Sequence, residues 1–200
     1  MQCHRLPRLY HSRMAVHVTL RPISVSEYAR MREAGILAED DRVELIAGEI
    51  RRTSPIGPLH AAIVKKLNEL LLLLLAQSAI VSVQDPIQLD DLSEPQPDLA
   101  VLKRRDDFYR QGIPTAEDTL IVIEVADASA DYDRKEKIPR YASAGIPEAW
   151  LIDVTNQVIE QYTLPGKSRY QNVRIHEWDD TLTAQVIPGL QIKVEQVFGL

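Results

Sequence analysis

Three stretches of the chain have the pattern of helices. Between residues 59 and 77, apolar residues return every three or four positions, which predicts a long helix with one buried stripe. A second helix is predicted over residues 25–33, where Ser24 and Glu27 have the spacing of a capping box. A third is predicted over residues 133–144, just before a glycine that suits a helix end. In the long helix we expect the buried residues to be Ile63, Leu67, Leu70, Leu71 and Leu74.

Short runs of β-branched and other apolar residues predict strands between these helices. Residues 41–55 have the pattern of a hairpin with Ala47 and Gly48 at its turn. A long polar loop is expected over residues 104–118. Further strands are expected at residues 17–23, 79–90, 97–102, 120–126, 148–154, 158–164, 168–175 and 191–198. Because strands and helices are interleaved, we expect a mixed sheet flanked by helices, an α/β fold of the α+β type.

Composition is consistent with one folded domain. A chain of 200 residues with 45% hydrophobic and 26% charged residues suits a single core, expected over residues 16–200 after a disordered tail at residues 1–15. The single cysteine, Cys3, cannot form an internal disulfide, and no Cys and His cluster predicts a zinc site. The leucine run 70–75 is too short to span a membrane, and the N-terminus lacks the apolar centre of a signal peptide. A cytoplasmic protein is expected.

The formal net charge of −6 limits how this chain can meet nucleic acid. A protein that coats nucleic acid without sequence preference is usually basic, so that role is disfavoured. A nuclease is not excluded, because acids around a metal lower the net charge while basic residues elsewhere meet phosphates. Candidate basic groups are Arg51 with Arg52, Lys65 with Lys66, and Lys103 with Arg104 and Arg105. Each group on its own is more often plain solvated surface.

Two carboxylates at the ends of predicted strands are the strongest candidates for chemistry. Asp98 follows a proline in QPDLAVL, and Glu124 lies in the apolar run LIVIEVA. Alternation along the strand puts Glu124 among apolar side chains, where an unpaired charge is strongly disfavoured. Two such acids can bind a divalent cation that activates water. The alternatives are turn chemistry for Asp98, and a solvated strand end or a salt bridge to Arg134 or Lys137 for Glu124.

Other polar residues extend this group. Glu44 is a third acid with apolar neighbours, although a solvent-facing hairpin residue is equally expected there. Lys137 and Tyr141 lie four residues apart on one helix face, but Lys135 flanks the same apolar stripe. Helical geometry therefore does not choose between the two lysines. His60, at the start of the long helix, suits a general base, a substrate contact or a plain loop residue.

The order of five motifs resembles a known family. VELIAGEI, SPIGPLHAAIVKKL, QPDLAVL, LIVIEVADAS and DRKEKIPRYASAGIPEAWLIDV follow one another as in the Uma-two family of restriction-endonuclease-like proteins. The resemblance runs from Val43 to Val154 and continues more weakly to the C-terminus. It implies the PD-(D/E)xK nuclease fold, which has a central mixed sheet, helices on both sides and a metal site at the strand ends.

The resemblance assigns roles to the candidates that match its motifs. Asp98 corresponds to the aspartate of the PD element, and Glu124 to the acid of the second element. The lysine that usually stands two residues after that acid is absent, because this position is Ala126. Lys137, on the next predicted helix, matches the lysine that this family carries there, and Tyr141 is expected to hold it in place.

Two further matches complete the expected site. Glu44 corresponds to an upstream acid of the family, and His60 to a histidine at the start of its long helix. The resemblance implies that Mg²⁺, or Mn²⁺ as a substitute, is bound by Asp98 and Glu124. Glu44 is expected to be a further metal ligand or a water-positioning acid.

The leading hypothesis is a Mg²⁺-dependent endonuclease that hydrolyses DNA phosphodiester bonds. A homodimer is one option for its assembly, because a duplex presents two strands. The alternative is a catalytically inactive nuclease-like scaffold that binds protein or nucleic acid, which the acidic balance and Ala126 favour. Hydrolysis of another phosphorylated substrate has no dedicated motif, since the chain has no glycine-rich phosphate loop.

Overall fold

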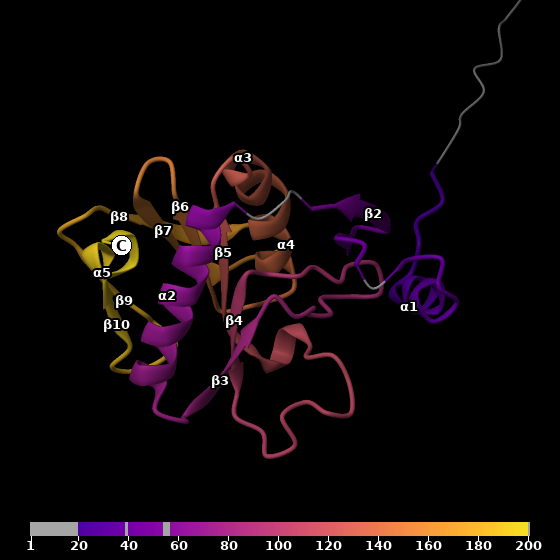
Figure 1. The fold of residues 1–200 in the computed structure, drawn as a ribbon, viewed down its shortest axis with the longest axis horizontal. Helices are drawn as coiled ribbons and strands as arrows, with labels where there is room; N and C mark the ends of the chain where they lie inside the picture. Colours follow the sequence, from indigo (N-terminus) through magenta and orange to yellow (C-terminus); the bar gives the residue numbers. More distant parts are fainter. Residues whose placement is uncertain (1–19, 39, 54–56, 200) are drawn as a thin grey trace, which may run out of the picture.

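The computed structural model of the protein describes residues 20–38, 40–53 and 57–199, and a six-stranded sheet forms its centre (Figure 1). The strands are β3 (Ala79–Val83), β4 (Leu99–Lys103), β5 (Thr119–Ala126), β6 (Glu148–Asp153), β7 (Val158–Pro165) and β8 (Tyr170–His176). They lie in the order β3-β4-β5-β6-β7-β8. Neighbours are antiparallel except β5 and β6, which are parallel, so the expected mixed sheet is confirmed.

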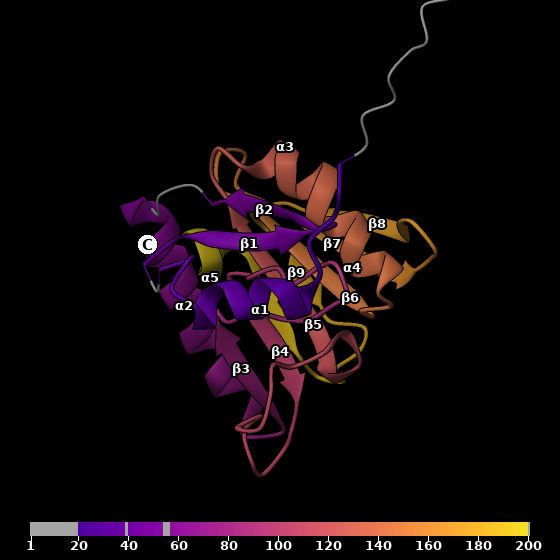
Figure 2. The same cartoon turned by 90° about the vertical axis from the view of Figure 1, so that its right-hand side faces the viewer.

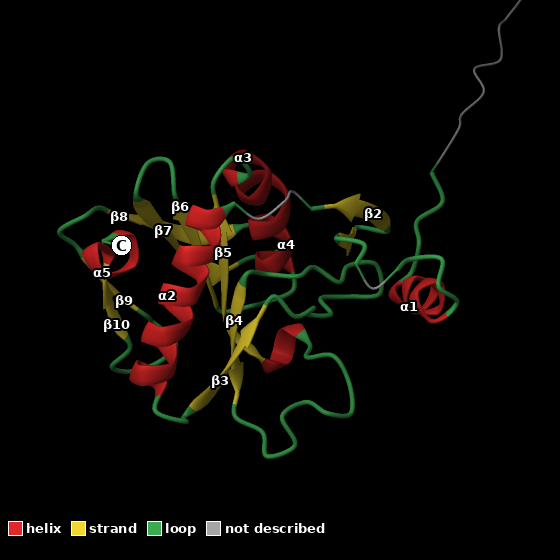
Figure 3. Ribbon diagram, viewed as in Figure 1, coloured by secondary structure: helices red, strands yellow, loops and turns green. Residues whose placement is uncertain are grey.

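Helices cover both faces of this sheet (Figures 1 and 3). One face is covered by α2 (Pro58–Leu75), α5 (Val194–Phe198) and the hairpin of β9 (Thr181–Thr183) and β10 (Gln191–Lys193). The other face is covered by α3 (Ala130–Tyr132), a π-helical turn (Asp133–Lys137) and α4 (Ile138–Ser143). Side chains of β5 pack alternately into the two cores, Ile121 toward α2 and Val122 toward α4. A strand buried on both faces is therefore apolar almost throughout.

The buried stripe of α2 differs from the expected one at its C-terminal end. The buried residues are Ile63, Val64, Leu67, Leu71 and Leu75. Leu70 is only partly buried, and Leu74 is 46% exposed. Within a run of six leucines, composition does not indicate which ones face the core. Steps of four residues from Leu67 through Leu71 to Leu75 keep one helix face on the sheet. Among the described residues, no helix is long and apolar enough to cross a membrane.

A small unit of one helix and one hairpin lies beside the central sheet (Figure 2). Helix α1 (Val25–Glu33) begins with the expected capping box of Ser24 and Glu27. The expected hairpin consists of β1 (Val43–Ile46) and β2 (Glu49–Arg52). At its turn Gly48 has a φ of +77°, and a Cβ there would lie 2.4 Å from the Cβ of Pro22, so only glycine fits. The hydroxyl of Tyr28 donates to the carbonyl of Val43 and joins α1 to β1.

Several strand predictions were wrong at their ends. Residues 20–23 form no strand, and the rest of that expected strand lies outside the described residues. The strand expected over residues 79–90 ends at Val83, because the next residue, Gln84, has a φ of +56° that breaks the ladder. The expected C-terminal strand continues into α5, in which Val194 and Val197 are buried at helical spacing. Strand β9 was not predicted.

Two expectations about the N-terminus concern residues that the structure does not describe. The tail of residues 1–15 and the single cysteine, Cys3, lie outside the described residues. The assignment of residues 16–200 to one domain therefore stays a prediction.

Candidate functional site

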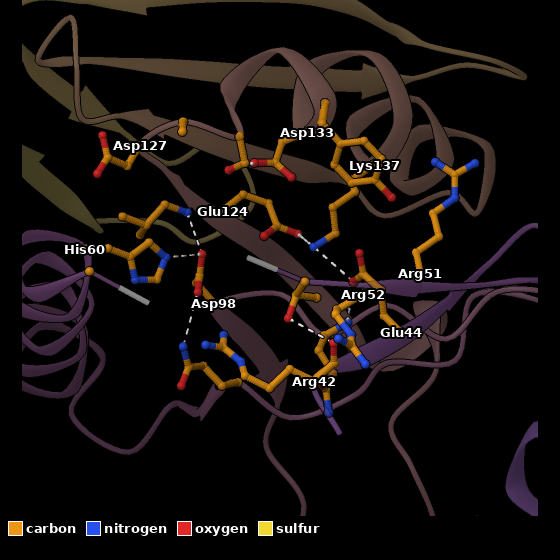
Figure 4. A pocket seen from close by; sticks show the side chains of 18 of the residues that line it. Arg42, Glu44, Arg51, Arg52, His60, Asp98, Glu124, Asp127, Asp133 and Lys137 are labelled. Atoms are coloured by element: carbon orange, nitrogen blue, oxygen red, sulfur yellow. Dashed lines mark hydrogen bonds and ion pairs between the residues drawn. The ribbon is translucent and has the colours of Figure 1, made fainter. Parts of the chain in front are cut away.

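A pocket of about 610 Å³ opens where the C-terminal end of β5 meets the β1–β2 hairpin and the start of α2 (Figure 4). Seven residues singled out in the sequence line it: Glu44, Arg51, Arg52, His60, Asp98, Glu124 and Lys137. Polar residues not expected there line it as well, among them Arg42, Gln84, Asp127, Tyr132 and Asp133. The fold thus brings together side chains that lie up to about a hundred residues apart in the sequence.

Asp98 and Glu124 lie opposite each other on one face of the sheet. The residue after Asp98 pairs with the residue before Glu124 in the antiparallel ladder of β4 and β5, so the register places the two acids side by side. Alternation along each strand puts Asp98 on the face of Ala100 and Glu124 on the face of Val122. Both Ala100 and Val122 belong to the core under α4. The two carboxylates therefore converge on the side of the sheet that α4 covers.

The carboxylate of Asp98 is held by two hydrogen bonds to one oxygen. His60 Nε2 lies 3.1 Å from Oδ2, and the backbone N–H of Val125 donates to the same oxygen over 2.9 Å. Oδ1 accepts a longer bond of 3.3 Å from Gln84 Nε2. Burial alone would raise the pKa of Asp98, but the hydrogen bond and charge of His60 hold this pKa below its usual range. The same hydrogen bond raises the pKa of His60.

Lys137 joins two buried carboxylates. Its ammonium forms an ion pair with each of them, 2.8 Å from Glu124 Oε1 and 3.2 Å from Glu44 Oε2. The three side chains are exposed by only 6%, 4% and 3%, so each charge depends on the others for compensation. The hydroxyl of Tyr141 donates a hydrogen bond to Glu124 Oε1, the same oxygen that Lys137 approaches. The expected role of Tyr141 in holding Lys137 stays a prediction. The backbone N–H of Gln96 donates to Glu44 and fixes the far side of the cluster.

Burial and charge act in opposite directions within this cluster. Burial raises the pKa of Glu124, although the charge of Lys137 opposes the shift. Burial would lower the pKa of Lys137, but the charges of Glu124 and Glu44 raise this pKa above its usual value. The lysine is therefore a fixed positive charge at neutral pH and does not act as a base.

An irregular helical turn aims Lys137 at the acids. Pro139 has no N–H, and its ring crowds the carbonyl four residues before it, so a regular α-helix is interrupted there. The amide that follows Lys137 bonds instead to the carbonyl of Asp133, five residues earlier. In this wider turn Asp133 and Lys137 are both buried, while the side chain of Lys135 is 70% exposed. The regular helix expected over residues 133–144 therefore starts earlier and has a π-helical part, a feature common at functional sites.

Two residues that line the pocket, Asp133 and Arg42, were not singled out in the sequence. Asp133 lies one helical turn before Lys137, a spacing that places both on the same side. It accepts a hydrogen bond from Ser129 over 2.7 Å, and burial raises its pKa. Arg42, which comes just before β1, had no signal at all, because only the fold brings it to the pocket.

The oxygen donors of the pocket fit one divalent cation held by two carboxylates. Within the described parts of the chain, no three His, Cys, Asp or Glu side chains form a metal cage of their own. Mg²⁺ does not need one, because one or two carboxylates suffice when waters and substrate phosphate complete its octahedron. Asp98 and Glu124 supply such hard ligands. Glu44, by contrast, is linked to Glu124 through the ammonium of Lys137.

Comparisons with known proteins agree with this architecture. The model of a family described as "Uma2: Putative restriction endonuclease" matches residues 25–195. The fold is similar to that of the crystal structure titled "a putative nuclease belonging to DUF820" from Anabaena variabilis, with a TM-score of 0.69 and 18% identity. That match covers 89% of this chain and 98% of the other. No curated protein sequence matches. Because the family model spans most of the chain, this protein belongs to the Uma2 family.

Proposed function

We propose that this protein is a Mg²⁺-dependent endonuclease that hydrolyses DNA phosphodiester bonds. The observation that carries the proposal is the convergence of Asp98 and Glu124 in one pocket, with the ammonium of Lys137 2.8 Å from Glu124. Two acids that bind a metal ion, together with one ammonium group that offsets negative charge, are sufficient for metal-assisted hydrolysis of a phosphodiester. The family description, which names restriction endonucleases, supports a nucleic-acid substrate.

Asp98 and Glu124 would hold the metal, and their neighbours keep them in position. A bound Mg²⁺ would polarise the phosphate and make a bound water more acidic. His60 and the amide of Val125 fix the orientation of the Asp98 carboxylate. Tyr141 fixes Glu124 in the same way through its buried hydroxyl. Such positioning lowers the cost of reorganisation during the reaction.

Lys137 supplies a fixed positive charge for the substrate. Attack of water on phosphorus breaks the bond to one sugar oxygen, and negative charge grows on the phosphoryl oxygens before that leaving oxygen takes up a proton. An ammonium that stays protonated stabilises this charge or orients the water. Glu44 holds Lys137 from the side opposite to Glu124, so we assign it a positioning role in preference to metal binding. A homodimer stays a prediction, which sedimentation velocity tests.

A plasmid-nicking assay tests the proposal. We expect the wild-type protein to nick supercoiled DNA with Mg²⁺ or Mn²⁺ and to lose this activity in EDTA. Asp98→Asn and Glu124→Gln keep the shape of each side chain but remove its charge, and each should lower the nicking rate by at least about 100-fold. Asp131→Asn is the control, because this acid is 78% exposed and does not line the pocket.

Metal binding separates the enzyme from an inactive scaffold. Isothermal titration with Mn²⁺ should show one saturable site in the wild type and in Asp131→Asn, and none in Glu124→Gln. Circular dichroism establishes that each variant is folded. Retained nicking in both Asp98→Asn and Glu124→Gln contradicts the proposed roles. A folded wild type with neither metal binding nor nicking supports the scaffold.

A further inference from the structure

Two exposed arginines lie together at the open end of the hairpin. Arg52 ends β2 and pairs with the first residue of β1, which Arg42 immediately precedes. The backbone N–H of Thr53 donates to the carbonyl of Arg42 over 2.9 Å and ties the two chain segments together. Both arginine side chains line the pocket that holds the acids. Figure 4 shows them on the hairpin side of this pocket.

The charges of these two arginines have no protein partner in the described part of the chain. Every ion pair found among these residues leaves Arg42 and Arg52 out. Their neighbour Arg51 differs, because it lies 3.0 Å from Glu49 and 3.8 Å from Glu136. Arg51 also lies above the ring of Tyr132. Carboxylates therefore compensate the charge of Arg51, whereas Arg42 and Arg52 stay available to a ligand.

The other charged residues that line the pocket are mostly acidic, so a polyanion such as nucleic acid needs positive groups there in order to bind. Six acids line it: Asp41, Glu44, Asp98, Glu124, Asp127 and Asp133. Lys137 is engaged by two of them and is almost completely buried. A nucleic-acid strand that approaches this pocket meets a net negative surface, and positive groups at the mouth offset the repulsion. A guanidinium suits this task, because it donates two parallel hydrogen bonds to a phosphate.

We propose that Arg42 and Arg52 form a phosphate-binding pair that holds the sugar–phosphate backbone of the substrate strand beside the scissile phosphate. The ligand is the phosphodiester backbone itself, so the pair contributes affinity and register without choosing a base sequence. This inference rests on the proposed function, because it assumes that a nucleic-acid strand enters the pocket. It adds a binding subsite, built by the hairpin, to the acids of the sheet.

Salt-dependent binding in EDTA tests the pair without any cleavage. Fluorescence anisotropy measures the affinity for a 20-base-pair duplex and for a single strand over a range of NaCl concentrations. Replacing both residues, in Arg42→Ala/Arg52→Ala, should reduce the slope of log K against log salt by about 1.8 for the duplex and about 1.4 for the single strand. The arm with the larger loss of affinity identifies the form that the pair holds. The matched control is Arg110→Ala/Arg169→Ala, which removes two exposed arginines outside the pocket.

Each outcome decides the inference. A double variant that keeps the wild-type slope, or loses no more than the control, overturns it, as does a wild type that binds neither nucleic acid. Arg42→Lys/Arg52→Lys should recover most of the salt slope, since it keeps the charge, but not the full affinity of bidentate contacts. An arginine-dependent slope in a protein that never nicks DNA supports the pair and contradicts the proposed endonuclease. If the wild type nicks DNA but the double variant keeps the wild-type salt slope, the endonuclease is supported and the arginine pair is contradicted.

Discussion

The ammonium of Lys137 lies in contact with two buried carboxylates, Glu124 and Glu44. Almost no solvent reaches any of the three groups. At the scale of single residues, this burial gives one lysine of the helix a different role from its neighbour. Lys135 extends into solvent and bonds to Asp131, which is itself 78% exposed. Exposed pairs of that kind contribute little, whereas a buried charge that loses its partner is costly.

Replacing the two lysines separately should show this difference. Lys137→Ala leaves Glu124 and Glu44 buried without their shared cation, and we expect the free energy of unfolding to fall by about 3–5 kcal/mol. Lys135→Ala should change it by less than about 0.5 kcal/mol. Urea unfolding followed by circular dichroism measures both. Equal effects of the two substitutions contradict the cluster as described.

At the scale of elements, local sequence controls where helices begin and how regular they are. Pro139 interrupts the helix after β5 and accompanies the π-helical turn that directs Lys137 inward. At α1, the capping box of Ser24 and Glu27 determines where the helix begins. Glu27 Oε2 accepts the backbone N–H of Ser24 over 3.0 Å, and the carboxylate also pairs with Arg21. Both interactions favour the ionised form of Glu27.

The capping box of α1 has a measurable pH signature. The hydrogen bond from the Ser24 amide, followed by the bond to Arg21, lowers the pKa of Glu27 to about 2. The ionised carboxylate therefore stabilises α1 fully above its unfolded pKa near 4.5, and this contribution is lost as the pH falls through about 2. Carbon-13 NMR of the Glu27 carboxyl should find the low midpoint, and Arg21→Ala should raise it only in part. A midpoint near 4.5 contradicts the cap.

At the scale of the whole molecule, one crossover connection assembles the site. Strands β5 and β6 are parallel, so the chain between them must return across one face of the sheet, and α3 and α4 form this return. The start of the crossover therefore lies over the end of β5, which places Lys137 beside Glu124. The site thus depends on strand order as much as on the residues themselves.

Another buried acid, Glu148, joins the central sheet to the C-terminal segment. Its carboxylate accepts hydrogen bonds from Trp150 Nε1, from Gln161 Nε2 and from the backbone N–H groups of Gln185 and Val186. The residue is fully buried. The last two donors precede β10, so this one carboxylate holds the β9–β10 hairpin on the sheet.

Removing this carboxylate should loosen the C-terminal segment. Glu148→Ala removes the acceptor of the buried Trp150 indole N–H and of the part-buried amides of Gln185 and Val186, and we expect a loss of about 3 kcal/mol in the free energy of unfolding. Hydrogen exchange should then speed up in residues 181–193 before the central strands. Glu195→Ala, which removes an exposed acid of α5, is the control and should change stability by less than about 0.5 kcal/mol. Similar exchange rates in the two variants contradict the anchoring role.

Most helices and strands could be predicted from the sequence, because each depends on a local pattern. The capping box at Ser24, the Ala47–Gly48 turn and the apolar run of β5 are set by residues only a few positions apart. Asp98 and Glu124 were found in the same way, as polar residues in or beside apolar strands. The C-terminal end of β3 and the helix α5 were missed, because contacts with distant segments decide where those elements stop.

The tertiary structure alone decided how the site is assembled. Helical periodicity does not distinguish Lys137 from Lys135, and nothing local brings Arg42 and Arg52 to the mouth of a pocket whose acids lie on other strands. Those choices follow from the register of β4 and β5, from the crossover between β5 and β6, and from the position of the hairpin. The physical reason is the distance along the chain over which each kind of interaction acts. Periodicity and capping act between neighbours in the chain, whereas burial and charge compensation act between neighbours in space.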